Sequence, residues 1–312
     1  MIKLSVVIPC FNEEASLPIT LERVINAAKS SATHYEIILI DDGSTDGTWE
    51  LIKLESRNNP HIRGMRLSRN FGHQIALSAG LQSALGERIL IIDADLQDPP
   101  ELLTEMMRAL DEGADVAYGR RASRDGEGFF KLVTAFGFYR FINWLSDIEI
   151  PRDTGDFRLV NRKVIDAVNS MPERHRFLRG MFAWVGFRQV PVDYDRAERI
   201  AGESKYPVKA MLRFAITAIT SFSVRPLRLA MIMAACFAAA SFLGILYVVL
   251  GHFLGGTAQG WTSLMVVVLF IASLQFLLLG IIGEYIGRMF TEQKGRPLFI
   301  CSESCGSGAI GT

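Results

Sequence analysis

The sequence predicts an α/β domain built on a doubly wound, mainly parallel sheet, followed by two helices that cross a membrane. In roughly the first 120 residues, short β-branched runs alternate with stretches of helical spacing, which is typical of parallel strands joined by helical crossovers. Further along, residues 229–283 contain no Asp, Glu, Lys or Arg. Two apolar runs in this window are each long enough to cross a bilayer as a helix.

The elements of the α/β domain follow from the apolar periodicity. The expected strands are Leu4–Ile8, Glu36–Ile40, His61–Leu67, Ile89–Ile92 and Asp115–Gly119. The expected helices are Glu14–Lys29, Thr45–Ser56, His73–Leu85 and Pro100–Glu112. Because parallel strands end on one side of a sheet, the polar loops after these strands should meet at one edge, where such folds bind ligands.

The two apolar runs are Leu229–Leu250 and Ser263–Ile282, and the Gly-rich segment Gly251–Thr262 separates them. A buried helical hairpin in a soluble core is the alternative, but runs of this length without charge favour a membrane. Positive residues flank the pair only at its two outer ends. They are Arg225, Arg228, Arg288, Lys294 and Arg296. The positive-inside bias therefore predicts that both termini are cytoplasmic and that the Gly-rich turn is outside.

Composition excludes several classes of protein. The 312 residues carry 33 basic and 33 acidic side chains, so the zero net charge argues against a nucleic-acid partner. The four cysteines do not form paired CxxC motifs, which argues against zinc and against obligatory disulfides. Met1–Ile8 is too short for a signal peptide, and Pro9 interrupts it.

A carboxylate-rich stretch follows the fourth expected strand. If the chain stays extended, Asp93, Asp95 and Gln97 point the same way, because side chains alternate along a strand. Two carboxylates and an amide oxygen suit Mg²⁺ or Mn²⁺. The alternative is an acidic surface loop that caps the next helix. No GxGxxG follows any of the expected strands, and GxxxxGK[ST] does not occur, so a diphosphate in this pocket would need a metal.

The loop after the second expected strand, residues 41–48, is also polar. Asp42 could accept a hydrogen bond from the N–H of a uracil-like base. Its alternative role is to cap the helix that begins near Thr45, which Asp41 or Ser44 could do instead.

Two segments between the sheet and the membrane are candidates for the bilayer interface. Residues 129–147 combine seven aromatic side chains with Lys131 and Arg140, and the alternative is a helix packed on the sheet. Lys205, Lys209 and Arg213 are spaced by four and form a basic stripe, which could otherwise be an ordinary solvated face.

Several motifs in order resemble a known family. Pro9–Glu14, Asp41–Thr48 and Asp93–Glu101 resemble the motifs of inverting glycosyltransferases of family 2, which have the GT-A fold. Four further stretches resemble the polyprenyl-phosphate glycosyltransferases, among them bactoprenol glucosyltransferases and relatives of dolichol-phosphate mannose synthase. They are Asp153–Leu159, His175–Gly180, Ala201–Tyr206 and Gly283–Arg288. The absence of Gln-x-x-Arg-Trp speaks against a cellulose- or hyaluronan-type synthase.

The resemblance implies a role for individual residues. The nucleotide would be held by Pro9, Phe11, Glu13, Asp42, Asp93 and Ala94. Asp93, Asp95 and Gln97 would hold Mg²⁺ or Mn²⁺, and Asp95 and Asp156 would be the catalytic carboxylates. Cations that could hold an acceptor phosphate are Arg120, Arg121, Arg124, Lys131, Arg140 and Lys205.

The implied protein is a metal-dependent enzyme of the bacterial plasma membrane that transfers a sugar from a UDP-sugar to polyprenyl phosphate. Glucose and undecaprenyl phosphate are the expected substrates, with mannose or an amino sugar as the alternative donor sugar. A non-catalytic nucleotide-sugar-binding subunit of a flippase is the more distant alternative. The expected boundaries are 1–199 for the GT-A domain, 200–228 for a juxtamembrane segment, 229–284 for the hairpin and 285–312 for a cytoplasmic tail. Relatives suggest a homo-oligomer, such as a tetramer.

Overall fold

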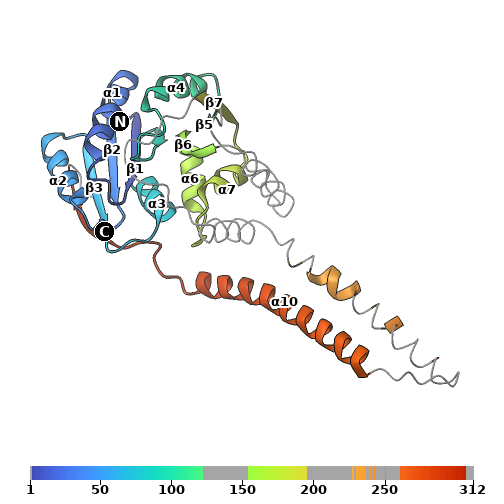
Figure 1. Cartoon of the computed structure of the whole chain (residues 1–312). Coiled ribbons are helices and arrows are strands. Elements are labelled where there is room, and N and C mark those ends of the chain that lie inside the picture. Colours follow the sequence, from blue (N-terminus) through green and yellow to red (C-terminus); the bar gives the residue numbers. More distant parts are fainter. Residues whose placement is uncertain are drawn as a thin grey trace, which may run out of the picture.

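The computed structural model describes residues 2–121, 154–194 and 261–306, with scattered residues between 227 and 250 (Figure 1). The segments 129–147 and 200–226, and half of the first apolar run, lie outside the described residues. In the described part, an α/β domain is followed by one long helix that projects away from it (Figure 1).

An eight-stranded sheet forms the centre of the domain, in the order β7-β5-β6-β4-β1-β2-β3-β8. The strands are β1 Leu4–Cys10, β2 Tyr35–Asp41, β3 Ile62–Leu67, β4 Arg88–Ile91, β5 Val116–Arg121, β6 Thr154–Asn161, β7 Gln189–Tyr194 and β8 Cys301–Cys305. Strands β1 to β4 pair in parallel, while β6 and β8 run antiparallel to their neighbours. The predicted mainly parallel sheet is therefore confirmed, and the carboxyl ends of β1, β2 and β4 meet at one edge.

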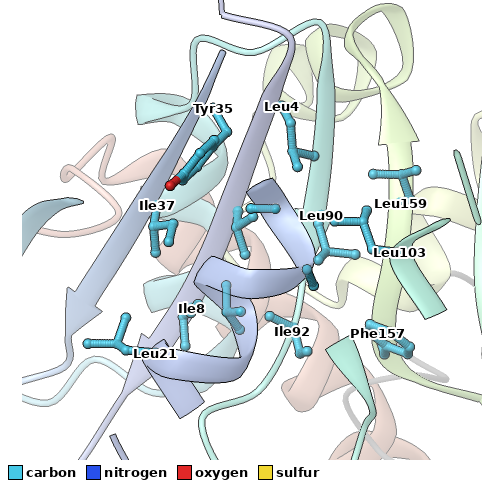
Figure 2. Close-up of a cluster of buried hydrophobic side chains, with 14 of the residues drawn as sticks. Leu4, Ile8, Leu21, Tyr35, Ile37, Leu90, Ile92, Leu103, Phe157 and Leu159 are labelled. Atoms are coloured by element: carbon cyan, nitrogen blue, oxygen red, sulfur yellow. The ribbon is translucent and has the colours of Figure 1, made fainter. Parts of the chain in front are cut away.

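Helices cover both faces of this sheet. They are α1 Leu17–Ser31, α2 Thr48–Asn58, α3 His73–Ser83, α4 Leu103–Asp111, α6 Arg162–Ser170 and α7 Leu178–Trp184, with a short 3₁₀ turn η1 at Pro100–Leu102. One buried apolar cluster joins the sheet to α1, α2 and α4, and part of it is shown in Figure 2. A second cluster joins the other face to α3, α6 and α7. Within β1, Val6 belongs to the first cluster and Val7 to the second, as the two-residue period of a strand requires.

Two helices begin later than the sequence predicts, because side chains bind the backbone just before them. The α2 helix begins at Thr48, where Asp46 Oδ1 accepts hydrogen bonds from the backbone N (3.1 Å) and Oγ1 (2.6 Å) of Thr48. The α1 helix begins at Leu17, and Ser16 Oγ just before it donates to the Glu13 carbonyl (3.3 Å) and to the Glu13 carboxylate. These contacts keep the residues before the helices in the loops at the sheet edge.

The helix after the first apolar run is longer than predicted. The α10 helix extends over Trp261–Gln293, whereas the predicted run ended at Ile282. Within the described residues, one segment, Phe270–Gln293, is long and apolar enough to cross a membrane.

The chain returns from α10 to the sheet, where β8 pairs with β3 (Figure 1). A domain boundary at residue 199 leaves this strand out, although residues 301–305 complete the sheet edge. The sequence could not indicate this pairing, since β8 is separated from β3 by more than 200 residues.

Candidate active site

A cleft of about 340 Å³ opens at the carboxyl ends of β1, β2 and β4. It is lined by Pro9, Cys10, Phe11, Glu13, Asp42, Asn70, Gly72, His73, Ala76, Asp93, Ala94 and Asp95. All six residues predicted to hold a nucleotide are in this lining. The structure therefore brings together loops that follow four different strands.

The loop after β1 is locked to the loop after β2 by reciprocal hydrogen bonds. The Asn12 backbone N donates to Ser44 Oγ (3.0 Å), and the Thr45 backbone N donates to Asn12 Oδ1 (2.9 Å). Asn12 has a φ of 56°, a left-handed conformation that asparagine tolerates better than most residues. This turn leaves the Phe11 ring 45% exposed at the cleft, where a flat base could stack on it.

Asp42 binds the loop after β3 and does not cap a helix. Its Oδ1 accepts from the Phe71 backbone N (2.7 Å), and its Oδ2 accepts from the Gly72 backbone N (2.9 Å). Burial raises the pKa of the Asp42 carboxyl, while these two backbone donors oppose the rise. The alternative role of Asp42 as a helix cap is therefore wrong, because Asp46 serves α2 and Asp42 organises the cleft wall.

The carboxylate stretch is a turn and not an extended strand. Strand β4 ends at Ile91, and Leu96 adopts a left-handed φ of 58°. The premise that alternation along a strand aligns the three candidate metal ligands is therefore wrong. The turn still brings Asp93 and Asp95 into the cleft, but Gln97 is not among the lining residues, and its backbone N donates to Asp95 Oδ1 (3.2 Å).

Asp93 has the properties of a carboxylate that can bind a cation. Its Oδ1 is buried and accepts no hydrogen bond, and His73 Nε2 lies 3.6 Å away. Burial raises the pKa of Asp93 to about 6, against the opposing influence of His73. Among the described residues, no group of three His, Cys, Asp or Glu side chains forms a metal cage. The residues present fit Mg²⁺ or Mn²⁺ bound by two carboxylates together with substrate phosphate oxygens.

Asp156 lies next to the cleft on β6 and is almost completely buried. Three side chains donate to it or face it. They are Arg179 on α7, with Nε 3.0 Å from Oδ1, and His73 and Gln74 on α3, with Nε2 atoms 3.2 Å and 3.0 Å from Oδ2. The predicted catalytic carboxylate is thus held in one orientation by two helices.

These contacts determine the ionisation of Asp156. Burial alone would raise its pKa, but Arg179 and His73 outweigh burial and hold the pKa well below its usual range. For His73, burial is likewise outweighed by Asp156 and Asp93, which raise its pKa to about 9. A carboxylate that stays ionised in this way is a weak proton acceptor. Its geometry suits the fixing of neighbouring groups and the stabilisation of positive charge at a reacting carbon.

His73 and Gln74 were missed by the sequence analysis. His73 connects the two predicted sites, since its Nε2 lies 3.6 Å from Asp93 Oδ1 and 3.2 Å from Asp156 Oδ2. Gln74 Oε1 also accepts from the Leu178 backbone N (2.9 Å), which ties α3 to the start of α7. The available signal was the polar stretch Asn70–Gln74, which follows a parallel strand and so must lie at the same edge.

Of the predicted acceptor cations, one has a described side chain. Arg120 donates two hydrogen bonds to Asp193 on β7, of 2.6 Å and 2.8 Å, on the exposed surface. Arg121 ends β5, and Arg124, Lys131, Arg140 and Lys205 lie outside the described residues.

Comparison with known proteins agrees with this geometry. Residues 5–168 match glycosyl transferase family 2, and residues 225–289 match the GtrB C-terminal hairpin, a range that contains both predicted membrane runs.

Similar proteins extend over almost the whole chain. The chain is 45% identical to the uncharacterized glycosyltransferase YkcC of Bacillus subtilis over 306 residues, covering 98% of this chain and 95% of that protein. It is 38% identical to a prophage bactoprenol glucosyl transferase homolog of Escherichia coli, covering 96% and 98%. It is 37% identical to the bactoprenol glucosyl transferase of Shigella phage SfII, covering 97% and 98%. With the mainly parallel sheet and the cleft at its carboxyl edge, these matches establish that the chain is a glycosyltransferase of family 2 that carries a GtrB-type C-terminal hairpin.

Proposed function

We propose that this enzyme transfers glucose from UDP-glucose to a polyprenyl phosphate, such as undecaprenyl phosphate, at the cytoplasmic face of a bacterial plasma membrane. The observation that carries the proposal is that His73 joins the cleft predicted to hold the nucleotide to the buried Asp156. Relatives named bactoprenol glucosyl transferase support both the sugar and the lipid class.

The donor would lie in the cleft with its base on Phe11 and the N–H of the base toward Asp42. Asp93 and Asp95 would hold Mg²⁺ or Mn²⁺, with Gln97 as a further ligand by resemblance. When bound, the metal supplies the positive charge that the departing diphosphate requires.

The reaction would be a single displacement. An acceptor phosphate oxygen forms a bond to the anomeric carbon, the bond from that carbon to the UDP oxygen breaks, and the electron pair leaves with UDP. An α-linked donor would then give a β-linked lipid phosphate sugar. The acceptor is already anionic near neutral pH, so the step needs no general base. This agrees with an Asp156 that is held ionised by Arg179 and His73.

A panel of radiolabelled nucleotide sugars, offered to membranes that contain undecaprenyl phosphate, tests the proposal. UDP-glucose should label the lipid, and mild acid should release the labelled sugar from it. Labelling by GDP-mannose or UDP-N-acetylglucosamine alone would contradict the choice of sugar. No labelling by any donor would contradict the reaction.

The acceptor site gives one specific prediction. Lys205 follows Gly202-Glu203-Ser204 and begins the basic stripe near the membrane, where a lipid headgroup must lie. Lys205→Ala should slow transfer about tenfold to a hundredfold, because a charged hydrogen bond to phosphate contributes about 1.5–3 kcal/mol. The nucleotide-sugar affinity, measured by calorimetry, should stay the same. An equal loss of UDP binding would instead place Lys205 in the donor site.

The hairpin gives a second prediction, for membrane topology. Two crossings place residues 251–262 outside, so a cysteine introduced as Ala258→Cys should react in intact cells with a membrane-impermeant thiol reagent. Cys301 and Cys305 provide a control on the same chain, because they lie on the sheet and should react only after lysis. Labelling at position 258 only after lysis would contradict the two-crossing topology.

A further inference from the structure

The segment that follows the long helix α10 contributes to the donor cleft, although it is not part of its lining. It returns to the sheet as β8, whose residues pair with β3 in the register Arg66↔Glu303. On the other side of β3, Arg66 is paired with Asp41 of β2. Asp41, Arg66 and Glu303 therefore form a row of alternating charge across three adjacent strands.

The distances in this row show that Arg66 is held between two carboxylates. Its Nε lies 3.2 Å from Asp41 Oδ2, and its Nη1 lies 3.7 Å from Glu303 Oε1. Asp41 is completely buried, whereas the side chains of Arg66 and Glu303 are 32% and 52% exposed. The exposed Glu303 carboxylate thus helps to hold the partly exposed Arg66 guanidinium next to the buried Asp41 carboxylate.

Arg66 and Asp41 shape the loop that carries Asp42. Asp41 Oδ1 accepts from the Ser44 backbone N (3.0 Å), and Arg66 Nη2 donates to the Ser44 carbonyl (3.3 Å). Ser44 in turn accepts from the Asn12 backbone N, which fixes the turn beside Phe11. The effect of Arg66 therefore reaches both loops that would hold the base.

Glu303 also contacts the far end of the same loop. Its Oε2 accepts a 3.0 Å hydrogen bond from Trp49 Nε1, and Trp49 is a buried residue in the first turn of α2. The Arg66 guanidinium lies 5.9 Å from the Trp49 ring centroid. Glu303 therefore contacts Trp49 directly at one end of the loop Asp42–Thr48, and it reaches Asp41 at the other end through Arg66.

The position of β8 is fixed by contacts at the end of α10. The Glu292 carboxylate accepts from the backbone N of Arg174 (2.9 Å) and of His175 (3.4 Å), and His175 Nε2 lies 3.1 Å from Thr291 Oγ1. The Arg174 guanidinium donates to the carbonyls of Arg296 and Pro297. The connection from α10 to β8 is thus held against the α/β domain before the strand begins.

We propose that Glu303 is a positioning residue for the donor: through Arg66 and Trp49, it holds the loop Asp42–Thr48 in the conformation that binds the nucleotide. The identity of the ligand rests on the proposed function, while the effect on the loop does not. A strand that only covered the sheet edge would have no such link, because its backbone pairing does not depend on the charge at position 303.

The test compares variants of the full-length enzyme by the affinity for UDP-glucose and by steady-state transfer. Glu303→Ala should raise the donor Kd and KM about threefold to tenfold and change kcat less than about twofold, as expected for the loss of a partly exposed ion pair and one hydrogen bond. Glu303→Gln retains an acceptor for Trp49 and should show a smaller rise. Ser302→Ala is the matched control, because Ser302 Oγ donates only to the Arg66 carbonyl in the same strand pair.

A double-mutant cycle separates positioning from simple stability. If Glu303 acts through Arg66, then Arg66→Gln should weaken donor binding, and adding Glu303→Ala should cause a smaller further loss than it does in the wild type, because only the hydrogen bond from Trp49 remains to be removed. Fully additive effects, or an unchanged donor Kd in both Glu303 variants, would overturn the proposal.

Hydrogen exchange of the ligand-free protein separates this inference from the proposed function. The amides of residues 42–48 should exchange faster in Glu303→Ala than in the wild type, while those of Ser302→Ala should not. A wild-type enzyme that does not bind UDP-glucose would contradict the choice of donor. Unchanged exchange in the loop would contradict the role of Glu303, whichever nucleotide is bound.

Discussion

Replacing Asp156 by asparagine should lower the rate of sugar transfer by about 100-fold to 1,000-fold, the range seen when a preorganised electrostatic group is removed from an active site. The amide keeps the size of the side chain but removes the charge that Arg179 and His73 face at 3.0 Å and 3.2 Å. Arg179 and His73 would then lose this negative charge beside the reacting carbon, while His73 would still face Asp93 at 3.6 Å. The loss should therefore appear in kcat.

Donor binding should be nearly unaffected by Asp156→Asn, because Asp156 is not in the lining of the cleft. The fold should also persist, since the side chains of Arg179 and His73 are 31% and 44% exposed and can be solvated. Asp166→Asn is the matched control, since Asp166 lies on the exposed face of α6 and pairs only weakly with Arg162 at 3.7 Å. Pre-steady-state transfer and calorimetry with UDP separate the two effects. A variant that transfers at the wild-type rate would remove Asp156 from the reaction.

Replacing Asp95 by asparagine should abolish detectable transfer, as should excess EDTA with the wild type. The reason is that two carboxylates, Asp93 and Asp95, enter the cleft, and Asp93 Oδ1 is buried without a hydrogen bond. A metal bound there would contribute several kcal/mol of charge stabilisation, which corresponds to a loss of about 1,000-fold or more.

Metal addition distinguishes a metal site from other causes of inactivity. Mg²⁺ or Mn²⁺ added after EDTA should restore the wild type and should not restore Asp95→Asn. The matched control is Asp111→Asn, which removes an exposed carboxylate at the end of α4 that pairs with Arg88 of β4 and is not in the cleft lining. Full activity in excess EDTA would contradict the metal requirement, even if Asp95→Asn were inactive.

The carboxylate-rich stretch after β4 shows where sequence reasoning succeeds and where it fails. The apolar run before Asp93 predicted a buried strand, and the polar residues after it predicted a ligand site at the strand end. Strand β4 confirms the first prediction, and a cleft lies at its end, while the ligand site itself stays a prediction. The predicted extended conformation of residues 93–97 was wrong, because Leu96 adopts a left-handed φ that turns the chain. No local sequence pattern predicts this backbone conformation for a leucine. Asp93 and Asp95 still reach the cleft, but through this turn and not along an extended strand.

The residues around Asp156 show a second limit. His73 and Gln74 are close to Asp156 only because α3 packs on β1 and β2 with its first residues next to β6, and more than 80 residues separate them from Asp156 in the chain. In the local sequence, nothing distinguishes these two residues from other polar residues of a helix. Their position after a parallel strand could have placed them at this edge of the sheet, but only packing could show which carboxylate they contact.

By itself, the sequence determined that this protein has a mainly parallel α/β domain with a polar carboxyl edge, and that a long charge-free stretch follows it. These properties depend on local periodicity and composition, which can be read from residues that are close together in the chain. Only the tertiary structure decided that Asp42 holds the loop after β3, that His73 joins Asp93 to Asp156, and that Glu303 pairs with Arg66. Each of these contacts links residues from separate elements, and its existence depends on sheet order and register, which follow from burial of the whole core and not from any single stretch of chain.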